Sequence, residues 1–505
     1  MNYVFFIGGS GARAYKAFLH LCAAGVIKAN LVKAALLDAD TQNAACKESC
    51  DLFRLYCRKR AMLNAARFST SAFYCDVRMY GDAAVISPIH EDIKHLGDVD
   101  GGNDVRRRAM KWFYTEAERE QDLTNGFYAH PNMGRIFFQN IGRVPAIEDC
   151  LDEMISDLRN DEEVRVAIVG SVFGGTGAAG IPSIFNIIQD RCKRESVPTD
   201  MLHICGILIS PYFRVAEAKA GTAGIHIDSG NFYGNTKAAL SYYRVVDQFE
   251  KTYLIGQNEL ELINTEYADG GAAQNNKPHI VEVFAAMAVK HFLEGPADNA
   301  KWLGKIVDRR NPQAKITWDD FDPDIYMWMD MLRTQAVLAA EIYPHVLDHE
   351  KGIKRTYQWY KVYHVNSGDG QIALENMRDY TAAFWTWMYG LTHKYEGSFQ
   401  VPQPDGEIAL CDVNVVAGLR AYSAPEARED GTKAYSSNKR TWKERQEAFC
   451  RLVDTAQKIE FVADKLIVIL SILGVVPGMN PGLGCADLFI KLFGLTAHWK
   501  ALNAS

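Results

Sequence analysis

The chain has 505 residues, of which 48% are hydrophobic and 23% are charged, so its composition excludes a disordered chain and predicts two or three packed domains. The formal net charge of −7 supplies no overall basic field, and we expect no direct nucleic-acid binding. The 11 cysteines include no CxxC pair, which is typical of reduced thiols in a cytosol. No export signal is evident, and the longest uncharged apolar run, Leu466 to Val476, is shorter than the roughly 20 residues of a transmembrane helix. We therefore expect a cytoplasmic protein without a transmembrane segment.

Strand-like and helix-like patterns alternate through the first 300 residues. Apolar runs of strand length are followed by segments with helical periodicity, which predicts an α/β fold with a doubly wound parallel sheet and ligands at the carboxyl ends of its strands. The expected strands are Tyr3 to Ile7, Leu31 to Leu37, Val164 to Val169, Met201 to Ile209 and Thr252 to Ile255, and the expected helices are Ala12 to Ala24, one from Ile181, and Thr236 to Val246.

Residues 43–125 interrupt this alternation with polar sequence that includes Arg58-Lys59-Arg60 and Arg106-Arg107-Arg108. We interpret the segment as a helical insertion whose basic triplets lie on solvated helix faces. Beyond about residue 315 the pattern becomes mixed. It predicts helices at 323–345, 374–391 and 440–472, with a long loop at about 398–439.

Glycine-rich turns follow two of the expected strands. Gly8-Gly9-Ser10-Gly11-Ala12 follows the first strand, and Phe173-Gly174-Gly175-Thr176-Gly177-Ala178-Ala179-Gly180 separates a later strand from the next helix. Glycine permits close approach of the backbone to a ligand, and the free N–H groups at a helix N-terminus favour anions. We therefore expect the amides of residues 8–12 and 174–178 to bind phosphates, with the Thr176 hydroxyl as a further donor.

Two acidic residues, Asp38 and Asp40, follow the second expected strand. They are candidates to hold Mg²⁺ mostly through water, because Mg²⁺ dehydrates reluctantly and is usually shared with phosphate oxygens. The competing interpretation is that these acids cap a helix.

The order of these motifs resembles the tubulin/FtsZ superfamily of GTPases. Asp38-Ala39-Asp40-Thr41-Gln42 occupies the place where bacterial FtsZ has Asn-Thr-Asp-Ala-Gln, and Ala129-His130-Pro131-Asn132-Met133-Gly134-Arg135 is similar to the family's Ala-Asn-Pro-x-x-Gly-Arg loop. The turn at 173–180 is similar to the family signature GGGTG(S/T)G, with Phe173 in place of its first glycine and Ala178 in place of its Ser or Thr. Asn231-Phe232-Tyr233-Gly234-Asn235 and Gly256-Gln257-Asn258-Glu259-Leu260 then follow in the family's order. The resemblance covers roughly residues 1–300.

The resemblance implies a GTP-binding domain at 1–276 that contains the insertion, a long central helix at 277–294, a second α+β activation domain at 295–400, and a loop and C-terminal helices at 401–505. It implies GTP or GDP as the ligand, with Mg²⁺ at Asp38 and Asp40. The other residues that it assigns to the nucleotide are Gln257, Asn258, Asn276 and His279 near the base, together with Gly8, Gly9, Ser10, Gly11, Ala12, Gln42, Pro131, Asn132, Gly134, Phe173, Gly174, Gly175, Thr176, Gly177, Ala178 and Asn235.

In the family, an acidic loop after the central helix enters the nucleotide site of the next subunit and positions the attacking water. The corresponding stretch here is Gly295-Pro296-Ala297-Asp298-Asn299-Ala300, so Asp298 is the first candidate, and Asp319, Asp320 and Asp322 are the alternatives. The resemblance thus implies a GTPase that assembles head to tail into filaments. It leaves the 43–125 insertion or the C-terminal region to bind a system-specific protein partner. All four acids have a competing interpretation as helix caps.

Two other classes of function stay open. A nucleotide-dependent assembly switch or scaffold would bind the nucleotide with little or no hydrolysis. A dinucleotide-binding oxidoreductase or an adenylating enzyme would use Gly8 to Gly11 and Asp38, but it leaves Gly174 to Gly180 without a role.

Overall fold

In the computed structural model of the protein, the described residues run from 1 to 392 with gaps, and beyond 392 they comprise 419–420, 426–427, 433–434, 488–489 and 492–493. The gaps are 66–71, 90–93, 101–103, 140, 217–225, 258–262, 266–269, 275, 296–299, 308–319, 340–342 and 344–367. The expected helix at 440–472 lies outside the described residues.

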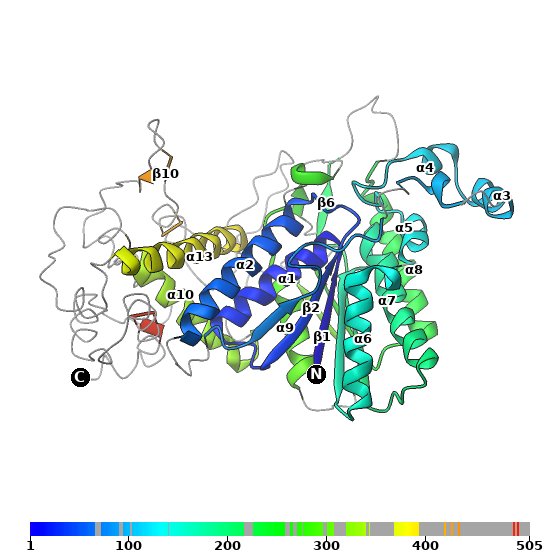
Figure 1. Ribbon diagram of the computed structural model, residues 1–505. Coiled ribbons are helices and arrows are strands. Elements are labelled where there is room, and N and C mark those ends of the chain that lie inside the picture. Colours follow the sequence, from blue (N-terminus) through cyan, green and yellow to red (C-terminus); the bar gives the residue numbers. More distant parts are fainter. Residues whose placement is uncertain are drawn as a thin grey trace, which may run out of the picture.

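A parallel sheet of seven strands forms the centre of the molecule (Figure 1). Its order is β3-β2-β1-β4-β5-β7-β9, and every neighbouring pair is parallel. This arrangement confirms the expected α/β class with a doubly wound parallel sheet. The strands are β1 (Asn2–Ile7), β2 (Leu31–Leu37), β3 (Asp76–Met79), β4 (Val164–Ser171), β5 (Leu202–Ile209), β7 (Lys251–Gln257) and β9 (Trp302–Val307).

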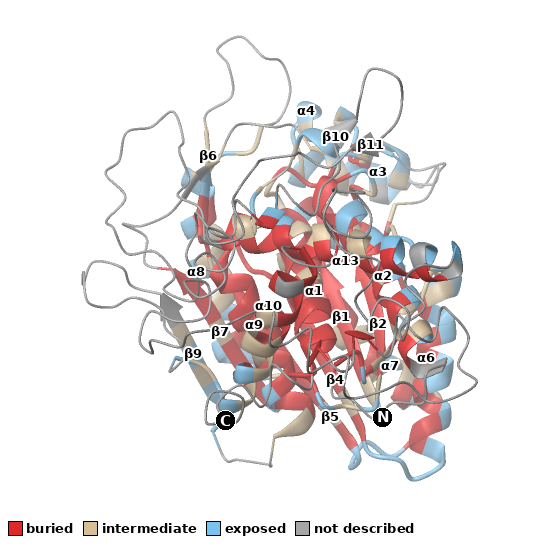
Figure 2. Cartoon of the chain, turned by 90° about the vertical axis from the view of Figure 1, so that its left-hand side faces the viewer, coloured by how far each residue is buried: buried red, intermediate tan, exposed pale blue. Residues whose placement is uncertain are grey.

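Helices cover both faces of the sheet because its central strands are apolar on both sides. In β1, Val4 and Phe6 belong to one core cluster, and Tyr3, Phe5 and Ile7 to the other. Figure 2 shows the buried residues concentrated along these strands and the helices against them. The first cluster includes α1 (Gly8–Ala24), α2 (Ala44–Ala65), α9 (Ile280–Glu294), α10 (Tyr326–Val337) and α13 (Gly368–Thr392), and the second includes α5 (Pro131–Phe138), α6 (Pro145–Arg159), α7 (Gly175–Arg194) and part of α8 (Gly230–Val246).

The segment at 43–125, interpreted from the sequence as a helical insertion, contains a strand of the central sheet as well as helices. Its first helix, α2, packs against α1, and β3 pairs with β2 at the edge of the sheet, so both continue the alternation of strands and helices. Because β3 has only four residues and carries Asp76 and Arg78, it has no apolar run that would predict a strand. The short elements η1 (Leu96–Asp100), α3 (Asp104–Phe113) and α4 (Glu116–Glu120) follow, and α3 projects from the body (Figure 1).

The sheet also extends beyond the domain boundary expected at residue 295. The central helix expected at 277–294 is present as α9, but β9 follows it and pairs with β7 instead of starting a separate sheet. The described parts of α10 and α13 share a core with α1, where the His20 ring stacks on Trp387 with centroids 4.3 Å apart. The remaining elements are β6 (Phe213–Val215), β8 (Ile263–Thr265), β10 (Glu426–Ala427), β11 (Lys433–Ala434), η2 (Ile141–Arg143), η4 (Gly271–Ala273) and η6 (Pro323–Ile325).

The order of the strands reverses between β1 and β4. From β1 the chain builds outward through β2 and β3, and it then returns to start β4 on the other side of β1. In doubly wound sheets the ligand site lies beyond the carboxyl ends of the strands at such a reversal. Among the described residues, no helix has the length and apolar composition that crossing a bilayer requires.

Candidate functional site

A pocket lies where the strand order reverses, beyond the carboxyl ends of β1, β2 and β4. Both glycine turns and both acids expected from the sequence contribute to its wall, and so does Asn276. The predicted residues that line it are Gly8, Gly9, Ser10, Asp38, Asp40, Phe173, Gly174, Gly175, Thr176, Gly177 and Asn276. Residues that the sequence analysis did not assign to the pocket line it too, namely Arg13, Asn43, Asn125, Gly126, Phe127, Tyr128, Ala129, Ser171, Phe213, Val215, Ile227, Phe232 and Gln274.

Two helices begin at this pocket without a side-chain cap. The N-cap residue of α1 is Ile7, and the N-cap residue of α7 is Gly174. Neither residue has a side chain that accepts a capping hydrogen bond from the first turn of its helix. The first turn of neither helix contains an acidic residue. The first N–H groups of a helix lack partners within the helix, and its dipole is positive at that end. The pocket therefore presents two sets of backbone donors suited to an anion.

The glycines of the two turns have different roles. A Cβ on Gly177 would lie 2.4 Å from the Ser171 carbonyl oxygen, so α7 can approach β4 only with glycine at this position. A Cβ on Gly11 would lie 2.9 Å from the backbone carbonyl carbon of Phe6. Gly177 and Gly11 thus permit each helix to pack closely against its strand, and this packing positions the backbone amides at the helix N-termini. Gly11 itself does not line the pocket. A Cβ on Gly9 would meet only atoms at 3.6 Å or more, which is ordinary contact.

The Asp38 and Asp40 carboxylates are buried in the wall of the pocket. The Thr176 hydroxyl donates to Asp38 Oδ1 at 3.1 Å, and the Cys46 thiol donates to Asp38 Oδ2 at 3.5 Å. The Gly271 N–H donates to Asp40 Oδ2 at 2.6 Å, and the Gln42 N–H donates to Asp40 Oδ1 at 3.0 Å. Asp38 and Asp40 do not cap the helix that follows them. The N-cap of α2 is Asn43, whose Oδ1 accepts from the Ala45 N–H at 2.9 Å.

Both carboxylates have raised pKa values. Burial, and after it the charge of Asp40, raise the pKa of Asp38 from 3.8 to about 7, although its hydrogen bonds act in the opposite direction. Burial also raises the pKa of Asp40. A cation would favour the ionised forms. Among the described residues, no group of three or more His, Cys, Asp or Glu side chains is placed to hold a metal. Two carboxylates whose oxygens already accept hydrogen bonds fit Mg²⁺ held through water and ligand phosphates.

The loop before α5 forms another wall of the pocket. Tyr128 and Ala129 have φ angles of 46° and 60°, and such left-handed backbone in non-glycine residues needs support from its surroundings. Asn235 supplies part of this support, because its Nδ2 donates to the Ala129 carbonyl at 2.8 Å and to the Phe173 carbonyl at 3.1 Å. Asn235 thus connects two loops of the pocket and does not line it.

One end of the pocket is apolar. Phe173, Phe213 and Phe232 form a cluster with ring centroids 4.9 to 6.1 Å apart. Asn276, which the sequence analysis placed near a base, also lines the pocket. An apolar wall with a few polar groups is typical of small-molecule sites.

Several predicted residues lie away from the pocket wall. Gln257 ends β7, two strands away from β4, and His279 is the N-cap of α9, where its Nδ1 accepts from the Val281 N–H at 3.1 Å. A Cβ on Gly134 would collide with Phe127 and Ala179, so this glycine serves packing. The predicted residues that are described but do not line the pocket are Gly11, Ala12, Gln42, Pro131, Asn132, Gly134, Ala178, Asn235, Gln257 and His279, whereas Asn258 lies outside the described residues.

Of the described candidate catalytic acids, Asp322 lies beside the C-terminal part of α9, whereas Asp320 lies beside Lys305, whose Nζ is 5.0 Å from the Phe284 ring in the N-terminal part of α9. Asp322 accepts from the Asp324 N–H at 2.8 Å as the cap of η6, and it pairs with Lys290 at 3.5 Å. Asp320 Oδ1 lies 3.4 Å from Lys305 Nζ. From Ile280 to Lys290 a helix rises about 15 Å, so Asp322 lies too far from the pocket to act within the same chain. Asp298 and Asp319 lie outside the described residues.

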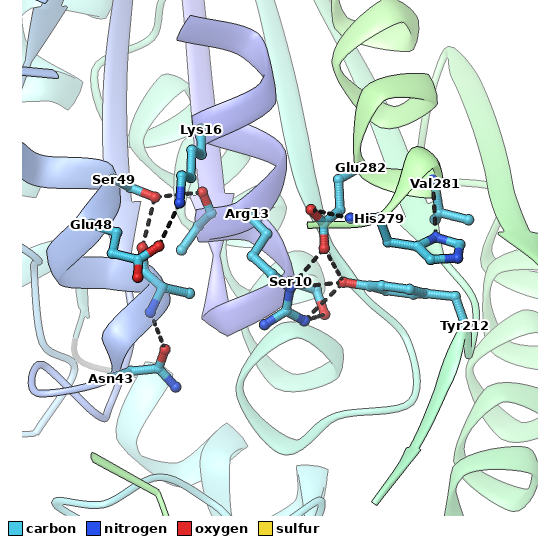
Figure 3. Close-up of polar contacts among 12 residues, drawn as sticks. Ser10, Arg13, Lys16, Asn43, Glu48, Ser49, Tyr212, His279, Val281 and Glu282 are labelled. Atoms are coloured by element: carbon cyan, nitrogen blue, oxygen red, sulfur yellow. Dashed lines mark hydrogen bonds and ion pairs between the residues drawn. The ribbon is translucent and has the colours of Figure 1, made fainter. Parts of the chain in front are cut away.

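Arg13 is the charged residue that the sequence analysis missed. It projects from α1 toward Tyr212 and Glu282 (Figure 3), and its Nε donates to Glu282 Oε1 at 2.8 Å. Its partner is 269 positions away in the sequence, so no local pattern indicates the pair. Arg13 follows the first glycine turn directly, and this position was the only feature of the sequence that could have indicated its place in the pocket.

Comparisons with protein-family models, curated proteins and solved structures found no match for this chain. The fold and the pocket define an α/β protein whose parallel sheet carries two uncapped helix N-termini and two buried carboxylates at its point of strand reversal.

Replacing Gly11 and Gly9 separately by alanine tests the two roles of the glycines. Gly11→Ala is expected to destabilise the fold by about 1–3 kcal/mol, because the new methyl group overlaps backbone atoms. Gly9→Ala is the matched control and should stay within about 1 kcal/mol of the wild type. Urea unfolding followed by circular dichroism measures both values, and equal stabilities would contradict the packing role of Gly11.

Asp38→Asn tests the raised pKa of Asp38. A pKa of about 7 in the folded state against 3.8 in the unfolded state means that the protonated carboxyl stabilises the fold fully below about pH 4, and that this stability is lost as the pH rises through 7. The variant should therefore be more stable than the wild type at pH 8, by at most about 4 kcal/mol, and the difference should shrink toward pH 4. Thermal unfolding without metal or nucleotide measures this difference. Asp51→Asn, at the surface beside Arg54, is the control for the substitution itself.

Proposed function

We propose that the chain binds GTP with Mg²⁺ in this pocket and assembles head to tail into filaments as a tubulin/FtsZ-like GTPase of the cytoplasm. The observation that carries the proposal is the convergence of two uncapped helix N-termini on one cavity that also contains Asp38 and Asp40. A dinucleotide-binding enzyme normally uses one glycine turn for its phosphates. The use of both turns by one cavity favours a ligand with a chain of phosphates.

The residues of the pocket have separate roles in this proposal. The amides at the starts of α1 and α7 bind phosphate oxygens. Asp38 and Asp40 hold the waters of Mg²⁺, which neutralises charge on the phosphates when bound. The apolar wall of Phe173, Phe213 and Phe232 packs against the nucleoside, and the Asn276 side chain offers hydrogen bonds to the base.

Hydrolysis in this proposal requires a second subunit. Arg13 of the pocket pairs with Glu282 at the start of α9, and Asp322 pairs with Lys290 in its C-terminal part, as expected if the acid acts on the next subunit. A head-to-tail contact of this kind does not close on itself and generates a filament. Asp298 remains the first candidate for positioning the attacking water, with Asp319, Asp320 and Asp322 as alternatives.

A nucleotide-dependent switch or scaffold with little hydrolysis is the second candidate function. It is favoured by the ion pairs of Asp320 with Lys305 and of Asp322 with Lys290, and by the role of Asp322 as a cap. A carboxylate engaged in this way is poorly available to orient a water.

The projecting helix α3 supports the proposal that the 43–125 segment contacts a protein partner. Trp112 and Phe113 are 82% and 75% exposed on this helix. Large aromatic side chains are enriched at protein interfaces and are unfavourable in water. The partner is either the adjacent subunit or a system-specific protein.

Light scattering and phosphate release, recorded together, test the proposed function. With GTP, scattering should rise, and the rate of phosphate release should grow faster than linearly with protein concentration, because each active site needs two subunits. Samples with ATP or without nucleotide should show neither signal. Scattering without phosphate release would favour the switch, and the absence of nucleotide binding would contradict both functions.

Separate substitutions of the candidate acids identify the activating residue. Asp298→Ala is expected to leave GTP binding intact and to slow phosphate release at least about 100-fold, within the range that general acid–base residues contribute. Asp320→Asn and Asp322→Asn should have small effects. If Asp298→Ala retains full turnover and one of the other variants loses it, the assignment of Asp298 is wrong.

A further inference from the structure

Arg13 is a buried cation in the wall of the pocket. Only 5% of the residue is exposed, although arginine is rarely buried without a specific partner. Among the described residues that line the pocket, Arg13 is the one basic side chain, and Asp38 and Asp40 are the acidic ones. A highly charged anion entering this cavity would meet two carboxylates, so its binding requires positive charge nearby.

One edge of the guanidinium is held by protein groups. Arg13 Nε donates to Glu282 Oε1 at 2.8 Å, and Arg13 Nη2 donates to the Tyr212 hydroxyl at 2.8 Å and to Ser10 Oγ at 3.2 Å. Glu282 is itself fixed, because its Oε2 accepts from the His279 N–H at 3.1 Å in the capping box of α9. Burial alone would lower the pKa of Arg13, but Tyr212 and Glu282 raise it above its usual value, so the group stays charged.

The other edge of the guanidinium is open to the cavity. None of the described residues accepts a hydrogen bond from Arg13 Nη1. This nitrogen lies beside Gly9, where a Cβ would be 3.7 Å away, and the lack of a side chain there leaves space above the first turn of α1. The planar guanidinium offers donors on two edges, so one edge can stay on Glu282 while the other binds a ligand oxygen.

We propose that Arg13 binds a phosphate group of the ligand through Nη1 and makes the pocket selective for nucleotides over nucleosides. This inference rests on the proposed nucleotide binding and names a side-chain cation that compensates phosphate charge together with the proposed Mg²⁺. Arg13 acts together with the N-terminal amides of α1 and α7, which orient the phosphate by hydrogen bonds but carry only a partial positive charge. Glu282 and Tyr212 hold the guanidinium in place, so little ordering of the side chain accompanies binding.

The test compares GTP, GDP and guanosine as probes on the wild type and on Arg13→Gln, by calorimetry at constant salt and Mg²⁺. In the wild type, affinity should rise from guanosine to GTP. In Arg13→Gln, GTP affinity should fall about 10- to 100-fold, the range for a hydrogen bond from a charged group, whereas guanosine affinity should be unchanged. Arg13→Lys should lie between the two, because it keeps the charge and loses the planar fork.

Two further variants separate ligand binding from folding. Arg13→Gln leaves Glu282 buried without its cation, so the double variant Arg13→Gln/Glu282→Gln removes both charges and should show the same selective loss of GTP. Lys290→Gln is the matched control, because it removes a cation paired with Glu294 and Asp324 at the far end of α9. It should leave the ratio of GTP to guanosine affinity unchanged.

The outcomes distinguish the two proposals. If the wild type binds neither GTP nor GDP, the proposed function and the role of Arg13 both fall. If the wild type binds GTP and Arg13→Gln binds it equally well, only the role of Arg13 is overturned. If Arg13→Gln and the double variant lose GTP and guanosine to the same degree, Arg13 has a structural role only, which also overturns the proposal.

Discussion

The close approach of α7 to β4 is the constraint on which the pocket depends. Gly177 lies so near the Ser171 backbone that no side chain fits between them, and Gly11 plays the same part between α1 and β1. These contacts bring two helix N-termini to one point of the sheet, where the strand order reverses. The donors of the pocket are therefore a product of backbone packing, and the side chains around them, such as Thr176 and Asn235, secure the surrounding loops.

Buried ion pairs lie toward both ends of α9. At its first turn, Glu282 both caps the helix and pairs with Arg13 from the pocket, and at its last turn Lys290 pairs with Asp322 and Asp324. One rigid, buried helix thus connects the pocket with the acidic region at the opposite end of the fold. In the proposed head-to-tail assembly, the two ends of α9 would face different neighbouring subunits.

The sequence predicted the central strands and the glycine turns well, and it predicted the strand pairing at the edges of the sheet less well. The apolar runs of β1, β2, β4 and β5 and the glycine turns after β1 and β4 carry local signals, and the structure has them close to their expected bounds. The four-residue strand β3 has no such signal, and neither does the return of β9 to the sheet, because pairing at a sheet edge depends on distant partners.

The same limit applies to the site. Asp38 and Thr176 lie in recognisable turns, and the structure brings them within hydrogen-bond distance. Gln257 and His279 follow the expected order along the chain, yet linear order does not say how many strands separate a residue from the pocket. Phe213 and Phe232 look like ordinary core residues in the sequence, and only the folded chain shows that they line a cavity.

The burial of the Asp38 carboxyl beside Asp40 has a consequence for the heat of the proposed ligand binding. With a pKa of about 7, Asp38 carries a proton in part of the molecules at neutral pH. In the proposed function, a divalent cation that enters the cavity would expel this proton, and the surrounding buffer would take it up. The measured enthalpy would then include the heat of protonating the buffer, and titrations in phosphate and in Tris would differ by the number of protons released per binding event multiplied by the difference between the ionisation enthalpies of the two buffers.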